Sequence, residues 1–117
     1  MPVSLKRVYE KPSLSDGKRV LVERLWPRGL KKEDAKVDEW LREIAPSTEL
    51  REWFGHDPEK WNGFKERYWK ELGKKQDVVS KLAKEIGEKH VTFVFAAKDE
   101  EHNNAVALRE YIERRVK

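Results

Sequence analysis

The chain has 117 residues, a length typical of one domain that buries about two thirds of its unfolded surface. It contains no cysteine and no apolar run long enough for a signal peptide or a membrane span, which excludes disulfides and thiol chemistry and favours a cytoplasmic location away from membranes. Lys and Arg exceed Asp and Glu by only 26 to 22, and the two signs are interspersed, so the charges favour a solvated surface over a nucleic-acid patch.

The first third of the chain alternates strand-like and turn-like segments. Apolar and polar residues alternate over 3–9, which predicts a half-buried strand at a sheet edge. A turn-rich loop over 10–18 follows, and the β-branched run at 19–24 predicts a central strand. A proline and a glycine within 26–29 end that strand. Apolar residues at helical spacing then predict a helix over 31–43, which a following proline stops.

The residue pattern in the middle of the chain predicts three helices. Ser47 or Thr48 can cap a short helix that ends at Gly55. An aspartate and a proline mark the start of a longer helix, whose apolar stripe continues to a closing glycine at position 73. A further helix carries its apolar face over 78–86 and ends at the next glycine.

The last third predicts the best strand of the chain and a final helix. Residues 90–97 form a nearly continuous apolar run, as expected of a strand covered on both faces. Asp99 can cap a helix that extends to about Arg115. The long helical connection between 19–24 and 90–97 requires these two strands to be parallel. We therefore expect a single compact α/β domain, in which helices cover a small sheet with a parallel core pair.

Parallel strands end on the same edge of a sheet, which is where open α/β folds bind ligands. The segment after the first core strand supplies Arg24 and Arg28, whose planar guanidinium groups suit carboxylate or phosphate. Trp26 could line a pocket, and Gly29 either lets backbone approach a ligand or completes a turn. The alternative is that both arginines pair with nearby surface acids.

The segment after the second core strand supplies Lys98, Asp99, His102 and Asn103. Lys98 could hold an anion, and Asn103 could contact the ligand. The positive end of the expected helix favours a neutral His102, which could act as a proton carrier with Asp99 orienting it. The alternative is a capping network in which the histidine and asparagine only stabilise the start of the helix.

Three further residues are candidates for the same site. His56 could carry protons, Trp53 could wall the pocket, and Ser47 could contact the ligand. Each has a structural alternative, a turn histidine, a core aromatic and a helix cap respectively. Glycine-rich phosphate loops are absent from the sequence, and its histidines lack the spacing of a zinc site, so no cofactor and no metal are predicted.

Several strings in the sequence are specific enough to suggest a family. They are RVLVERLWPRG from Arg19, APS from Ala45, LREWFGHDP from Leu50 and AAKDEEHNNA from Ala96. Together they resemble the YeaO-like group of the domain-of-unknown-function family numbered 488, over nearly the whole chain. The resemblance implies a compact α/β domain and no established activity. Broader relatives often carry cysteine near positions 96–103, whereas this chain has none.

Three functions remain open from the sequence. The leading hypothesis is a protein that binds an anionic, phosphate- or carboxylate-bearing small molecule at the carboxyl rim of its sheet, with acid/base catalysis undecided. The alternative is a nucleic-acid-binding or regulatory module that uses the same basic rim. On the last predicted helix, however, glutamates interrupt the basic residues, which disfavours nucleic-acid binding. The third is a scaffold that acts through a partner protein. The sequence leaves the oligomeric state open.

Overall fold

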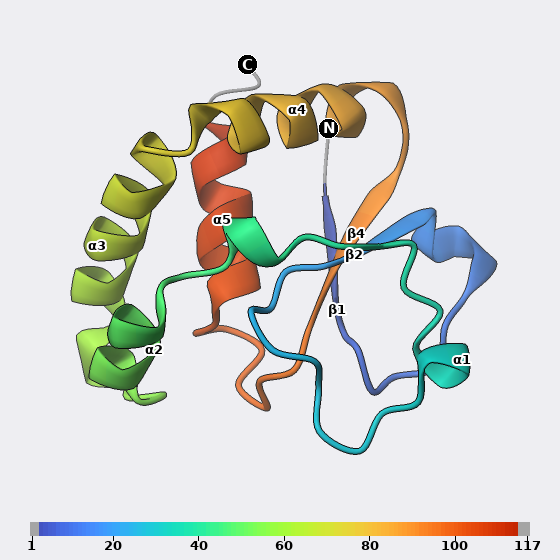
Figure 1. Ribbon diagram of the computed structural model, residues 1–117, viewed down its shortest axis with the longest axis horizontal. Coiled ribbons are helices and arrows are strands. Elements are labelled where there is room, and N and C mark those ends of the chain that lie inside the picture. The colour runs from blue at the N-terminus through green and yellow to red at the C-terminus, as the bar shows by residue number, and fades with distance from the viewer. Residues whose placement is uncertain (1–2, 115–117) are drawn as a thin grey trace.

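The computed structural model describes residues 3–114, which form a parallel sheet surrounded by helices (Figure 1). In the sheet, the strands lie in the order β1-β4-β2-β3. The strands are β1 (Ser4–Arg7), β2 (Lys18–Leu21), β3 (Glu39–Trp40) and β4 (Val91–Phe95). The α-helices are α1 (Lys32–Ala35), α2 (Thr48–Phe54), α3 (Trp61–Gly73), α4 (Gln76–Glu88) and α5 (Asn104–Glu113). Short 3-10 helices span Leu14–Asp16, Arg42–Ile44 and Pro58–Lys60.

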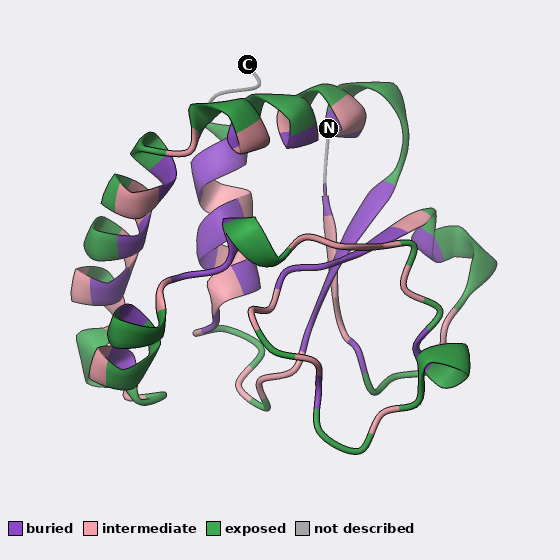
Figure 2. Ribbon diagram, in the orientation of Figure 1, coloured by how far each residue is buried: buried purple, intermediate pink, exposed green. Residues whose placement is uncertain are grey.

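The predicted core pair of strands is confirmed. β2 and β4 are parallel neighbours, with Val20 opposite Phe93. Every residue of β4 is buried, as its continuous apolar run predicts (Figure 2). β1 pairs with β4 and lies at the sheet edge, also as predicted. The segments that follow β2 and β4 therefore begin on the same edge of the sheet.

Alternate residues of the core strands point to two different layers. Val20 and Phe93 join the large core cluster formed with α2, α3, α4 and α5. Leu21 and Val94 join a smaller cluster on the other side, which the segment containing α1 covers. Trp26 packs against this smaller cluster together with Leu30, Val37 and Trp40. Both faces of the sheet are thus covered, which leaves its edges and rim for ligands.

The prediction of a single helix over 31–43 is wrong. The four-residue α1 and the start of the 3-10 helix Arg42–Ile44 form there, and Lys36 ends α1 in a left-handed conformation with φ of 51°. The chain then runs alongside β2 as the short strand β3, which places Glu39 opposite Val20. The Asp38 carboxylate accepts the Arg19 backbone N–H at 2.8 Å, which fixes this register. Pairing with the sheet therefore overrides the helical spacing of the apolar residues.

The other predicted helices form, with two corrections. The start predicted at Asp57 and Pro58 is a 3-10 helix, Pro58–Lys60, and α3 itself begins at Trp61. Ser47 caps α2 by accepting the Leu50 backbone N–H, and Gly55 ends α2 with φ of 54°. The last helix begins later than predicted, because Asn103 caps α5 and Asp99 does not. Its predicted end at Arg115 lies outside the described residues.

Candidate functional site

A cavity of about 210 Å³ opens at the carboxyl ends of β2 and β4, and we call it the rim cavity. It is lined by Glu23, Pro46, Arg51, Phe54, His56, Phe64, Ala96, Ala97, Asn103 and Asn104. The strand ends supply Glu23 and the two alanines, α2 and the turn after it supply Arg51, Phe54 and His56, and the start of α5 supplies the asparagines. A ligand cavity at this edge is what the parallel topology predicts.

Glu23 supplies the acidic group of the rim cavity. One of its carboxylate oxygens, Oε2, accepts the Ala96 backbone N–H at 3.1 Å, across the ends of the two core strands. Burial raises the pKa of Glu23, although the Ala96 N–H and the charge of Arg51 oppose the shift. The protonated carboxyl group is therefore favoured more than in a solvated glutamate.

Arg51 and His56 contribute basic groups from the exposed side of the cavity. Within residues 3–114, Arg51 forms no ion pair. His56 follows Gly55 in a left-handed conformation with φ of 58°, which is uncommon for a residue other than glycine. Its ring centroid lies 6.4 Å from that of Phe54. The tight turn after α2 thus keeps the imidazole beside the aromatic wall of the cavity.

The two asparagines join the start of α5 to the ends of the strands. Asn103 is buried; its Oδ1 accepts the Val106 N–H at 3.0 Å and its Nδ2 donates to the Asp99 carbonyl at 2.9 Å. Asn104 donates from Nδ2 to the Val22 carbonyl oxygen at 2.5 Å. The two hydrogen bonds of the Asn103 side chain hold the start of α5 against the turn before it, at the wall of the cavity.

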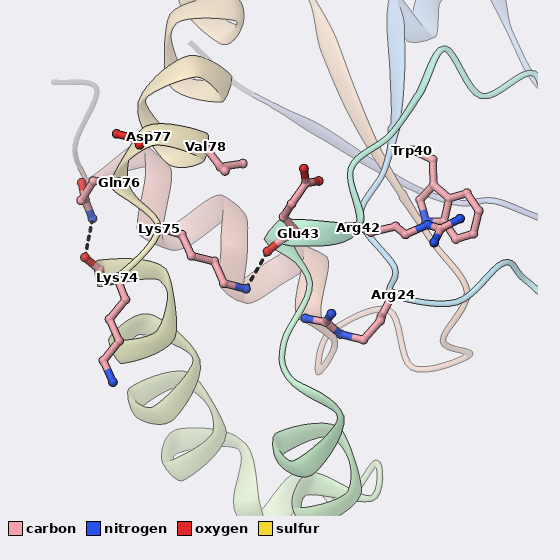
Figure 3. A pocket seen from close by; sticks show the side chains of 10 residues that line it. Arg24, Trp40, Arg42, Glu43, Lys74, Lys75, Gln76, Asp77 and Val78 are labelled. Atoms are coloured by element: carbon pink, nitrogen blue, oxygen red, sulfur yellow. Dashed lines mark hydrogen bonds between the residues drawn. The ribbon is translucent and has the colours of Figure 1, made fainter.

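A second hollow lies between the segment that follows β3 and the junction of α3 and α4, and we call it the basic cleft (Figure 3). It is open, with a volume of about 1000 Å³. It is lined by Arg24, Trp40, Arg42, Glu43, Gly73, Lys74, Lys75, Gln76, Asp77 and Val78. Arg24 donates from Nε to the Pro46 carbonyl and from Nη2 to the Ala45 carbonyl, each at 3.0 Å. The predicted ligand residue Arg24 therefore lies in this cleft and outside the rim cavity.

The other predicted residues of the first rim segment line neither hollow. The indole Nε1 of Trp26 donates to the Leu30 carbonyl at 2.7 Å, and the ring meets Trp40 edge-on. Arg28 is exposed, and its carbonyl accepts the Tyr9 hydroxyl. Gly29 has φ of 74° and no atom near the position of a Cβ, so it serves the turn.

The predicted proton-carrying pair forms, but it also lies outside the rim cavity. His102 Nδ1 lies 2.9 Å from Asp99 Oδ2, and the imidazole meets Trp61 edge-on. Asp99 also accepts the backbone N–H groups of Glu101 and His102, and these bonds lower the pKa of Asp99 together with the imidazole. His102 precedes the cap of α5, so the predicted first-turn position is wrong. Lys98 is exposed beside this turn.

Ser47 and Trp53 both have structural contacts. The Ser47 hydroxyl donates to the Glu71 carboxylate at 2.6 Å while it caps α2. Trp53 is half-buried, and the guanidinium of Arg67 stacks on its ring at 3.9 Å. Of the predicted site residues, the structure thus brings His56 and Asn103 together in the rim cavity.

Sequence reasoning missed Glu23, Arg51 and Asn104 as cavity residues. Glu23 had a usable signal, because it is the carboxylate at the end of a predicted buried strand. No sequence signal marks Arg51 or Asn104, because the face of a helix that lines a cavity depends on how that helix packs against the rest of the fold. Among residues 3–114, no group of three or more His, Asp or Glu side chains is arranged to hold a metal ion.

The fold and the rim cavity define a small parallel α/β domain with a cavity of about 210 Å³ at the carboxyl edge of its sheet. The chain belongs to the family described as the inactive DUF488-N3 subclade, whose model matches residues 2–117. This confirms the resemblance seen in the sequence strings.

The chain is similar to proteins from several bacteria. It is 40% identical to the uncharacterized protein YeaO of Escherichia coli (strain K12) over 112 residues, which cover 96% of this chain and 97% of the relative. It is 42% identical over 106 residues to the uncharacterized proteins Rv3073c of Mycobacterium tuberculosis (strain H37Rv) and Mb3100c of Mycobacterium bovis, covering 91% of this chain and 89% of each relative. No solved structure shows a significant match. Between residues 3 and 114, no helix combines the length and apolar composition needed to cross a membrane.

Proposed function

We propose that this protein binds a small molecule with a carboxylate or phosphate group in the rim cavity. The observation that carries the proposal is Arg51, which lines the cavity and forms no ion pair within the described part of the chain. A guanidinium group in this position can bind an acidic group through two parallel hydrogen bonds. His56 lies at the same exposed side and would add a further donor.

The inner part of the cavity would hold the uncharged part of the ligand. Phe54 and Phe64 supply apolar walls, stacked with their ring centroids 4.4 Å apart. Glu23 supplies a polar group, and in its protonated form it would donate a hydrogen bond to the ligand without repelling an anion. The volume of about 210 Å³ is below the ~300–1,000 Å³ of sites for drug-sized ligands, so the ligand is small.

Binding is favoured over catalysis. The pair of His102 and Asp99 lies outside the residues that line the rim cavity, so the proposed ligand would meet one imidazole, that of His56, without an orienting carboxylate. The family to which the chain belongs is described as inactive. We also propose a cytoplasmic location, because a sequence without cysteine fits a reducing compartment.

The test is a titration with acetate and glycolate, read out as the rise in melting temperature that a ligand of the folded state produces. We expect Arg51→Ala to weaken binding about tenfold or more, because it removes both charge-assisted hydrogen bonds of the guanidinium group. Arg28→Ala is the matched control, because Arg28 is exposed and lies outside the cavity. Equal effects of the two arginine substitutions would contradict the proposed site.

A further inference from the structure

Basic side chains outnumber carboxylates among the residues that line the basic cleft. Four cationic side chains and two carboxylates, those of Glu43 and Asp77, line it. The cationic residues are Arg24, Arg42, Lys74 and Lys75. None of the four forms an ion pair with another described residue, although lysines and arginines elsewhere in residues 3–114 do. A concave surface of this charge concentrates anions.

Arg24 and Lys75 are held close together in the middle of the cleft (Figure 3). Both donate to the Ala45 carbonyl oxygen, Arg24 from Nη2 at 3.0 Å and Lys75 from Nζ at 3.5 Å. Lys75 also donates to the Glu43 carbonyl at 2.6 Å. Carbonyl oxygens orient the two cations but bring no net negative charge. Burial and the neighbouring Arg24 lower the pKa of Lys75, although the charges of Glu71 and Glu43 oppose the shift.

These contacts also prepare the cleft for a ligand. Long cationic side chains normally lose rotamer freedom when they bind an anion, which costs free energy. Arg24 and Lys75 are oriented by their contacts with backbone carbonyls of the same chain. Arg42 is likewise held against the ring of Trp40, with its guanidinium carbon 3.9 Å from the ring centroid. An anion that binds in the cleft would therefore cause little further loss of side-chain conformational entropy in these cations.

We propose that the basic cleft binds a ligand with two linked phosphate groups, with Arg24 and Lys75 at its inner side. The cleft is far larger and more open than the rim cavity, at about 1000 Å³ against about 210 Å³. Arg42 and Lys74, at the edges of the hollow in Figure 3, supply the charge for the second phosphate. This site is separate from the rim cavity and takes a more highly charged ligand.

The probe is inorganic pyrophosphate, titrated into the whole protein by calorimetry at low ionic strength. We expect Lys75→Gln to weaken pyrophosphate binding about tenfold or more, because it removes a charge-assisted contact. Lys75 also holds backbone carbonyls, so this variant can lose stability as well. The double variant Lys74→Gln with Arg42→Gln alters exposed side chains only, and it too should weaken binding severalfold.

Two controls locate the site. Lys70→Gln with Lys84→Gln removes the same number of charges from exposed positions outside the cleft, and should leave the affinity within about twofold. Arg51→Ala alters the rim cavity and should also leave it unchanged. Absence of pyrophosphate binding, equal losses in the control and cleft double variants, or loss in Arg51→Ala would overturn the proposal. Binding of an RNA oligonucleotide that pyrophosphate does not displace would also overturn it.

Discussion

The rim cavity and the basic cleft begin at consecutive residues, Glu23 and Arg24, yet they differ in almost every physical property. β2 ends at Leu21 and the chain bends from Arg24, so these two neighbouring side chains reach different parts of the molecule. Glu23 reaches the end of β4, where it accepts the Ala96 N–H, whereas Arg24 reaches the carbonyl of Pro46. A single ligand rim expected from the sequence is therefore divided into two hollows with different chemistry.

The difference shows how one short segment can separate an enclosed site from an open one. Pro46 lines the rim cavity, while the Ala45 carbonyl binds both inner cations of the basic cleft. Next to them, the carbonyl of Ile44 accepts the buried hydroxyl of Tyr68 at 2.5 Å. The segment 44–46 is thus the wall shared by both hollows, and the Tyr68 hydroxyl anchors it to α3.

The largest expected effect comes from loosening this wall. Tyr68→Phe removes the donor to the Ile44 carbonyl and leaves a buried acceptor unpaired, which should cost about 1–3 kcal/mol of unfolding free energy. Since both hollows share the wall, binding of acetate and of pyrophosphate should weaken together. Chemical denaturation and calorimetry measure the two effects.

Tyr9→Phe is the matched control for Tyr68→Phe. The Tyr9 hydroxyl also donates to a carbonyl, that of Arg28, but at an exposed position where water can replace it. The stability should change by less than about 0.5 kcal/mol. If Tyr68→Phe weakened only one of the two ligands, the shared-wall interpretation would be wrong.

Much of the sheet could be predicted because its signals are local. The apolar run that forms β4 and the helical connection before it are sufficient to predict a parallel neighbour for β2. The caps at Ser47 and Gly55 likewise follow from the conformations that these residue types prefer. The edge of the sheet at which a cavity opens was therefore predictable.

The contents of the cavity were less predictable, because they depend on long-range contacts. The two-residue strand β3 forms where a helix was predicted. A hydrogen bond from the Arg19 backbone N–H to Asp38 lies next to this pairing, and no sequence pattern predicts that bond. Without β3, the direction of Arg24 and the wall at 44–46 could not be inferred. Arg51 faces the cavity only because α2 packs as it does.

The next prediction tests which residue organises the start of α5 beside the rim cavity. Asn103→Ala removes the helix cap and the bond to the Asp99 carbonyl, and should cost about 0.5–2 kcal/mol of unfolding free energy. Asp99→Ala, at the cap predicted from the sequence, should cost less, because Asp99 accepts its bonds in the preceding turn. Urea denaturation of both variants decides between them. A larger loss in Asp99→Ala would restore the sequence-based assignment.

The smallest expected effect is the pH dependence that Glu23 gives to the rim cavity. Burial raises the pKa of Glu23 in the folded state, so the folded protein holds this proton to a higher pH than the unfolded chain does. The contribution of Glu23 to stability is therefore fully present below its unfolded pKa and is lost as the pH rises through its folded pKa. Glu23→Gln, which keeps an acceptor for the Ala96 N–H, removes this dependence.

Urea denaturation of wild type and Glu23→Gln at acidic to neutral pH measures how Glu23 contributes to the free energy of unfolding. The wild type should lose stability relative to the variant as the pH rises, and Glu66→Gln, at an exposed position on α3, reports the general effect of removing one charge. The effect is expected to be modest, because the Ala96 N–H and Arg51 both favour the ionised carboxylate. A wild type that instead gained stability with rising pH would mean that these two groups outweigh burial. In that case Glu23 would meet a ligand as an anion, and the rim cavity would select a ligand with a hydrogen-bond donor or a positive charge at its inner end.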